Sequence, residues 1–161
     1  MRLLALDIGG LTQDILLFDT SQAVGNCVQM VMPSPTITLS NKIVAATKAQ
    51  RSLFFTGVNM GGGPSKRALL NHLKSGLAAY ATAEAAATFS DDIDEVAEWG
   101  VRIIGEGEMS QNKDIERIET RDLDLTAIEK TLAAFNVDPH LDGVAVAVLD
   151  HGAAPAGDSD R

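Results

Sequence analysis

Asp7-Ile8-Gly9-Gly10-Leu11-Thr12-Gln13-Asp14 stands between two short apolar runs, Leu3 to Leu6 and Ile15 to Phe18. An apolar run, a tight polar loop with two glycines and a second apolar run predict a strand, a turn and a second strand. We therefore expect residues 3–18 to form a β-hairpin that opens a sheet. The same stretch puts one acid at the end of the first strand and another at the start of the second.

The segments after the hairpin predict further strands and helices. Val28 to Met32 has the pattern of a third strand, and Ser34-Pro35 is a typical start for a helix over about Thr38 to Gln50. A strand at Ser52 to Val58 and a helix at Ser65 to Lys74 follow. The predicted order is therefore β-β-β-α-β-α.

The rest of the chain is less regular. Alanine-rich Tyr80 to Thr88 fits a strand as well as a helix. The elements expected after it are a helix capped by Ser90-Asp91-Asp92, strands at Val101 to Ile104 and Ile115 to Glu119, a helix opened by a capping box at Thr126 to Glu129, and a strand at Gly143 to Leu149. The unbroken apolar character of the last strand predicts a central position with helices on both faces.

Composition limits the class of protein. A chain of 161 residues with 45% hydrophobic content suits one domain. The net charge of -9 opposes the basic surface that nucleic-acid backbones require, so we expect no nucleic-acid partner. One cysteine, Cys27, excludes an intrachain disulfide and fits a reducing cytoplasm. Asp7 interrupts the first apolar run far short of a signal peptide or membrane span, so we expect a cytoplasmic protein with no membrane partner.

Each part of the hairpin loop suits phosphate chemistry. Gly9 and Gly10 let backbone N–H groups approach phosphate oxygens, and the Thr12 hydroxyl adds a donor. A carboxylate at a strand end, here Asp7, can hold Mg²⁺ or a water bound to it. The alternative is a plain glycine turn with solvated acids beside it.

The hairpin resembles the phosphate-binding hairpins of the actin-like ATPase superfamily, which includes actin, heat-shock chaperones and sugar kinases. The resemblance implies an α/β fold, a ribonuclease-H-like βββαβα lobe with a mixed sheet and helices on both faces. It also implies ATP and Mg²⁺ as cofactors, with Asp7 as a catalytic residue and metal ligand. The cofactor-binding residues that it implies are Gly9, Gly10, Thr12, Gln13 and Asp14. Leu11 departs from the pattern, because related hairpins usually carry a small residue there.

A second resemblance is to a family labelled as related to the pyruvate formate-lyase activating enzyme. Its N-terminus also reads Asp-Ile-Gly followed by Thr-Gln-Asp, and Gly61-Gly62-Gly63-Pro64, His72-Leu73 and Asp150-His151-Gly152 resemble further blocks of it. The radical chemistry in that label needs an iron-sulfur cluster held by three cysteines. This chain has only Cys27, so we do not expect that activity.

Two other segments are candidates for the site. Gly61-Gly62-Gly63 precedes a predicted helix, whose first N–H groups would suit an anionic substrate, although a plain strand-to-helix connection explains it too. Asp150-His151-Gly152 follows a predicted strand, and ligands gather beyond the carboxyl ends of strands in α/β sheets. We expect Asp150 to share a cleft with Asp7 as a second catalytic residue, with an Asx turn as the alternative. The expected substrate-binding residues are Gly61, Gly62, Gly63, His151 and Gly152.

The predicted function is that of an N-terminal actin-like lobe, residues 1–152, of an ATP-dependent phosphotransferase or hydrolase. Its partners would be a nucleotide, an unknown small-molecule substrate and a missing C-terminal lobe. Residues 153–161 are expected to form an irregular tail at a truncation point. One alternative is a non-catalytic scaffold that has lost nucleotide binding, which Leu11 favours. Another is a two-metal ribonuclease-H-like nuclease using Asp7 and Asp150, which the acidic composition disfavours.

Overall fold

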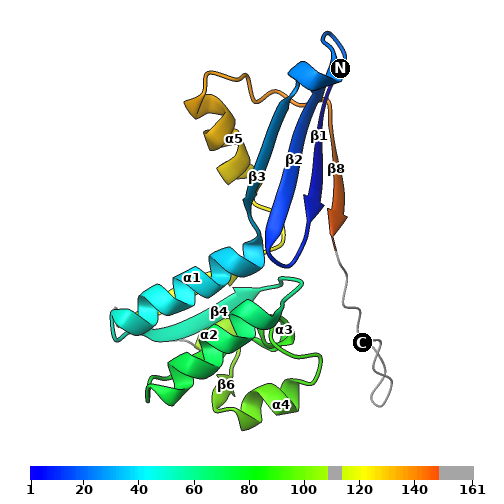
Figure 1. Ribbon diagram of the computed structural model, residues 1–161. Coiled ribbons are helices and arrows are strands. Elements are labelled where there is room, and N and C mark those ends of the chain that lie inside the picture. Colours follow the sequence, from blue (N-terminus) through cyan, green and yellow to red (C-terminus); the bar gives the residue numbers. More distant parts are fainter. Residues whose placement is uncertain (109–113, 149–161) are drawn as a thin grey trace.

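The computed structural model describes residues 1–108 and 114–148 of the chain (Figure 1). Its elements in chain order are β1 (Arg2–Ile8), β2 (Thr12–Asp19), the 3-10 turn η1 (Val24–Asn26), β3 (Val28–Pro33), α1 (Pro35–Lys48), β4 (Ser52–Gly57), α2 (Gly63–Lys74), β5 (Ala79–Ala81), α3 (Ala83–Ala87), α4 (Ile93–Glu98), β6 (Val101–Ile103), the 3-10 turn η2 (Glu106–Glu108), β7 (Ile115–Thr120), α5 (Leu125–Ala134) and β8 (Gly143–Val148). The predicted order of elements at the start of the chain is confirmed. The ambiguous Ala-rich segment contains both a strand, β5, and a helix, α3.

The first sheet contains the hairpin. Its strands lie in the order β3-β2-β1-β8, with β1 antiparallel to β2, β2 antiparallel to β3, and β1 parallel to β8. In this register Asp7 lies opposite Asp14 on β2 and opposite Ala147 on β8. The long hairpin and β8 stand side by side in Figure 1. The predicted hairpin and third strand are confirmed.

One face of the first sheet, here called the inner face, packs on α5. Leu4, Leu6 and Ile15 of the inner face share a core with Ile128 and Leu132 of α5. These two α5 residues lie four positions apart, so both point to the same side of the helix. The opposite, outer face carries side chains that alternate with the buried ones, and Asp7, Asp14 and Val31 are exposed there.

The second sheet is parallel, in the order β6-β5-β4-β7, and forms a separate core with α1 to α4. α1 begins where the Ser34 hydroxyl accepts a hydrogen bond from the Ile37 N–H and Pro35 takes the first helical position. It buries Leu39 and Ile43, which are one turn apart, against this sheet. The chain is therefore a mixed α/β fold with two sheets, and helices pack on both of them.

The strand predicted at Ser52 to Val58 forms as β4, in the second sheet, where its neighbours are the parallel strands β5 and β7. One prediction about strand placement is wrong. The strand at Gly143 to Leu149 was predicted to be a central strand. In the structure it forms β8, which is an edge strand of its sheet and has exposed side chains at Val144, Val146 and Val148. Apolar content favours the strand conformation and does not by itself specify what covers the strand.

The predicted capping box of α5 is also wrong. Asp124, and not Thr126, is the N-cap, because its carboxylate accepts a hydrogen bond of 3.0 Å from the Ala127 N–H. A carboxylate at this position also interacts favourably with the positive end of the helix dipole. Among the described helices, none has the length and apolar character that crossing a membrane requires.

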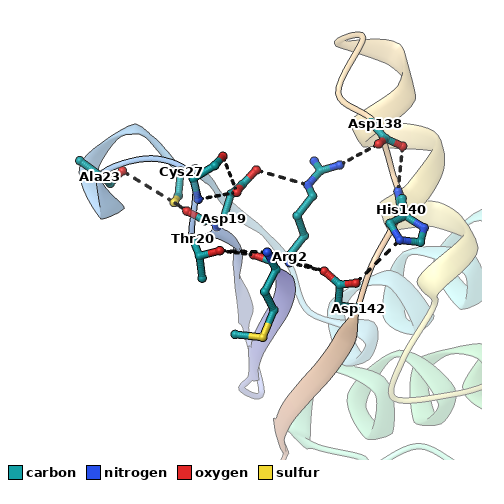
Figure 2. A network of polar contacts seen from close by, with 10 residues as sticks. Arg2, Asp19, Thr20, Ala23, Cys27, Asp138, His140 and Asp142 are labelled. Carbon is teal, nitrogen blue, oxygen red and sulfur yellow. Dashed lines mark hydrogen bonds and ion pairs between the residues drawn. The ribbon is translucent and has the colours of Figure 1, made fainter.

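A polar network closes the end of the first sheet that lies away from the hairpin loop (Figure 2). The Arg2 guanidinium lies between Asp138, at 3.1 Å from Nη1, and Asp19, at 3.7 Å from Nε. The Arg2 N–H donates to Asp142 at 2.7 Å. Hydrogen bonds from Ser21, first from its backbone N–H, lower the pKa of Asp19, and Arg2 adds to this effect. The network ties the segment before β8 to the start of β1, so it aligns the parallel pair.

Candidate functional site

The hairpin loop between β1 and β2 consists of Gly9, Gly10 and Leu11, with Gly10 and Leu11 at its tip. The Gly9 N–H donates to the Thr12 carbonyl oxygen at 2.9 Å and closes the strand pair below it. Neither Gly9 nor Gly10 has a positive φ, and a Cβ placed on Gly10 would meet no atom within 4 Å. The fold therefore does not need glycine at position 10. Close approach of a ligand to the backbone would need it.

Ser34, the N-cap of α1, holds this loop from one side. It is fully buried, its N–H donates to the Leu11 carbonyl oxygen at 3.0 Å, and its hydroxyl donates to the Gly10 carbonyl oxygen at 3.0 Å. In a trans peptide the N–H points opposite to the C=O, so the N–H groups of Leu11 and Thr12 point away from Ser34. Within the described part of the chain, the Leu11 N–H has no hydrogen-bond acceptor. Ser34 thus fixes the orientation of two successive N–H groups at the tip.

Two carboxylates lie beside the tip on the outer face. Asp7 and Asp14 are directly opposite each other in the register of β1 and β2, and both are exposed. They line a shallow hollow of about 610 Å³ whose floor includes Ala5 and Ala147. Like charges directly opposite each other on a sheet are unfavourable, and a divalent cation would remove that repulsion. Mg²⁺ is commonly held by one or two carboxylates together with substrate phosphates, so this pair fits Mg²⁺ with a phosphate ligand.

The structure separates Gln13 from the other predicted hairpin residues. Asp7, Gly9, Gly10, Thr12 and Asp14 lie at the tip or on the outer face. Gln13 alternates with them and faces inward, where its side-chain amide donates to the Pro33 carbonyl oxygen at 2.9 Å. Its role as a cofactor-binding residue stays a prediction.

The second glycine segment has a clear role in the fold. Gly61 has a φ of +74°, and a Cβ there would overlap the Thr88 carbonyl oxygen. Gly62 has a φ of +141° and approaches Thr36 closely. Gly63 is exposed, with no atom within 4 Å of a Cβ. Glycine is thus required by the backbone at 61 and 62, and only at 63 does the fold leave the residue type open. Substrate binding by these three residues stays a prediction.

The first turn of α1 joins the two glycine segments. Ser34 binds the hairpin loop, and two residues later the Thr36 hydroxyl donates to the Gly61 carbonyl oxygen at 2.9 Å. Buried Asn59 completes the link, because its side-chain oxygen accepts from the Gly61 N–H at 2.9 Å and its amide donates to Asp122 at 3.0 Å. Ser34, Thr36 and Asn59 are parts of the site that were not predicted from the sequence. Only Ser34 had a local signal, the cap before Pro35.

Asp150, His151 and Gly152 lie outside the described residues. β8 ends at Val148, which lies opposite Ile8 at the end of the parallel strand β1. β1 and β8 are thus neighbouring parallel strands. The shared cleft of Asp7 and Asp150 stays a prediction.

Two other titratable groups, Asp92 and His72, serve the fold. Asp92 caps α4 through the N–H groups of Asp94 and Glu95, as acids at a helix start are expected to do. His72 is fully buried, with Nδ1 at 2.8 Å from the Thr47 hydroxyl and Nε2 at 3.2 Å from the Ala78 carbonyl oxygen. Within the described residues, no group of three or more His, Cys, Asp or Glu side chains is arranged to hold a metal ion.

Comparison with known proteins identifies one family. The family described as "Putative pyruvate format-lyase activating enzyme (DUF1786)" matches residues 60–161. That stretch covers more than half of the 161 residues and begins after the hairpin. No curated protein and no solved structure matches the chain. The extent of the family match shows that the chain belongs to this family.

Proposed function

We propose that the chain is the phosphate-binding lobe of an actin-like protein that uses Mg-ATP for phosphoryl transfer or hydrolysis. The hairpin tip is the observation that carries this proposal. Gly10 is a glycine that the fold does not need, and the two N–H groups after it point away from the buried Ser34. A side-chain-free backbone with N–H groups turned the same way is the arrangement that phosphate oxygens require.

The arrangement of the first sheet supports the proposed ribonuclease-H-like lobe. Three antiparallel strands, β1 to β3, are followed in the same sheet by β8, which is parallel to β1. In this proposal the second sheet, with α1 to α4, is an insertion between β3 and β8. The position of the acids agrees with it, because Asp7 lies close to the carboxyl end of β1, where ligands of α/β sheets bind.

Each hairpin residue has a distinct role in the proposed site. The N–H groups of Leu11 and Thr12 and the Thr12 hydroxyl donate to phosphate oxygens. Asp7 holds Mg²⁺ directly or through water, and Asp14 offsets the remaining charge of the cation. Mg²⁺, when bound, neutralises the charge that develops on the transferred phosphoryl group. The contribution of this chain is then positioning and electrostatic stabilisation.

The test is calorimetric titration of Mg-ATP into the full-length protein and its Asp7→Asn variant. Asp7→Asn removes one exposed charge and almost no volume, so the fold should stay intact by circular dichroism. Binding that depends on Mg²⁺ should fall below detection. Glu129→Gln, on the exposed side of α5, removes a charge elsewhere and should bind as the parent does. Equal affinity of Asp7→Asn and the parent would remove Asp7 from the site.

A non-catalytic scaffold is the second candidate, and Leu11 is the observation that favours it. Its side chain is 64% exposed at the tip, where phosphate would bind. If Leu11 only crowds the phosphates, Leu11→Gly should leave Mg-ATP affinity unchanged or raise it. Should the parent protein bind no nucleotide and Leu11→Gly fail to restore binding, the scaffold replaces the enzyme.

A further inference from the structure

A second cavity lies on the inner side of the first sheet, away from Asp7 and Asp14. It has a volume of about 580 Å³, within the range of roughly 300–1,000 Å³ that is common for small-molecule sites. Its walls come from β2, β3, α1, α5 and β7, the last strand of the second sheet. Strands of both sheets and two helices therefore surround it. Ligand sites commonly occur where structural units meet in this way.

Part of the cavity wall is apolar, among polar and charged lining residues. Ile15 and Met30 contribute from the first sheet, Leu39 from α1, Ile118 from β7 and Ile128 from α5. All except Met30 are buried. Methionine adapts its shape to different neighbours, so Met30 suits a wall that accommodates a ligand. An aromatic or aliphatic body would gain contacts with all five elements.

The acids that line the cavity have partners within the protein. Glu116 forms an ion pair with Arg51, and Glu119 forms one with Arg121. Asp124 accepts a hydrogen bond from the Ala127 N–H as the N-cap of α5. Glu116 and Glu119 are therefore paired with arginines, whereas Asp124 keeps its charge at the start of α5.

One of the lining cations differs from the others. Arg121 pairs with Glu119, and the Arg117 guanidinium lies over the Phe54 ring, 5.3 Å from its centroid. Lys42, exposed on α1, forms no ion pair with any described residue. The Lys42 ammonium therefore has no ionic partner among the described residues, and the complement of its charge is an anion.

We propose that this cavity binds a small organic monoanion, an aromatic or aliphatic carboxylate. The apolar body lies against Ile15, Met30 and Leu39, and the carboxylate pairs with Lys42. The site lies on the opposite face of the sheet from the proposed phosphate site. The proposal of a carboxylate site therefore does not rest on the proposal of nucleotide binding.

Methyl NMR of the full chain labelled with ¹³C at the methionine methyl groups tests this proposal, with 2-naphthoate as the probe. Met30 and Met32 line the cavity, whereas Met1 is the N-terminal residue, at the end of the first sheet away from the hairpin loop. The methyl signals of Met30 and Met32, assigned with Met→Leu variants, should shift saturably while that of Met1 stays in place. Lys42→Gln should weaken binding by about tenfold, as expected for loss of a charge-assisted contact. Lys48→Gln, on the same helix but outside the cavity, should have no effect.

Two further comparisons separate charge from apolar contact. The uncharged amide of the same ring, 2-naphthamide, should bind about tenfold more weakly than 2-naphthoate. Ala127→Trp should block the cavity, whereas Ala134→Trp, exposed near the end of α5, should not. Equal affinity for acid and amide, an unchanged affinity in Lys42→Gln, or an unchanged affinity in Ala127→Trp would overturn the proposal. So would shifts of Met30 and Met32 that follow protein concentration without ligand, because a second copy would then occupy the cavity.

Discussion

The Ser34 hydroxyl donates a hydrogen bond of 3.0 Å to the Gly10 carbonyl oxygen, although 24 residues separate the two in sequence. The Ser34 hydroxyl oxygen also accepts a hydrogen bond from the Ile37 N–H, so one buried side-chain atom caps α1 and holds the hairpin loop. Formation of α1 and the conformation of the loop are therefore coupled through Ser34.

Replacing Ser34 should be costly. Ser34→Ala removes the helix cap and leaves the Gly10 carbonyl oxygen without its partner, which should lower the free energy of unfolding by about 2 kcal/mol or more. Urea unfolding followed by circular dichroism measures the change. Thr38→Ala, exposed on the same helix, should change it by about 0.5 kcal/mol or less. If the two variants unfold alike, Ser34 does not connect helix and loop as described.

The start of α5 gives a second test. Asp124→Ala should destabilise the protein by about 1 kcal/mol, because it removes the carboxylate that accepts a hydrogen bond from the Ala127 N–H. Thr126→Ala should be neutral or slightly stabilising, since alanine is the better helix former. If urea unfolding showed that Thr126→Ala destabilises the protein more than Asp124→Ala does, the capping box predicted from the sequence would be correct.

The two ends of the second glycine segment should respond differently to the same change. Gly61→Ala forces a Cβ into the Thr88 carbonyl oxygen at a positive φ and should destabilise the protein by about 2 kcal/mol or more. Gly63→Ala meets open space in α2 and should be neutral or stabilising by up to about 1 kcal/mol. Thermal unfolding of both variants measures the difference. Tolerance of Gly61→Ala would mean that position 61 does not need glycine for the fold.

Stability should depend on pH through His72. Burial lowers the pKa of its imidazole below the ordinary value of 6.5, and the Ala78 carbonyl partly opposes that change. The unfolded chain therefore takes up a proton at a higher pH than the folded one. The contribution of neutral His72 to stability is complete above pH 6.5 and is lost as the pH falls from there toward the folded pKa.

Urea unfolding from about pH 8 to about pH 5 measures this dependence. The free energy of unfolding should decrease on acidification, and His72→Gln should flatten the decrease even if the variant is less stable throughout. An equally steep slope in His72→Gln would assign the pH dependence to other groups.

Local patterns predicted most of the elements, because each depends on neighbours in sequence. The two short apolar runs of β1 and β2 and the Ser34-Pro35 start of α1 are examples. The division into two sheets was not predictable in the same way. Whether Ser52–Gly57 pairs with the hairpin or with Ala79–Ala81 depends on contacts between distant segments, to which local propensity is blind.

The candidate site was predicted in part for the same reason. The turn and the two acids are contiguous in sequence, and register alone puts Asp7 opposite Asp14. The hydrogen bonds of Ser34 to Gly10 and of Thr36 to Gly61 join segments that are far apart in sequence. Asn59 accepts a hydrogen bond from Gly61, in a loop whose path the sequence does not specify. A buried asparagine after a strand carries no local pattern that distinguishes it from a turn residue.

The most direct test of the proposed phosphate site is a pair of matched substitutions, Gly10→Val and Gly25→Val, in the full-length protein. A Cβ at either glycine would meet no atom within 4 Å, so both variants should fold. Gly25 lies in η1, on the connection between β2 and β3 at the end of the sheet away from the hairpin loop. Calorimetric titration with Mg-ATP should show at least about a tenfold loss of affinity for Gly10→Val, because the branched side chain occupies the space of the phosphate oxygens. Gly25→Val should bind as the parent does, whereas equal affinity of both variants and the parent would contradict phosphate binding at the hairpin.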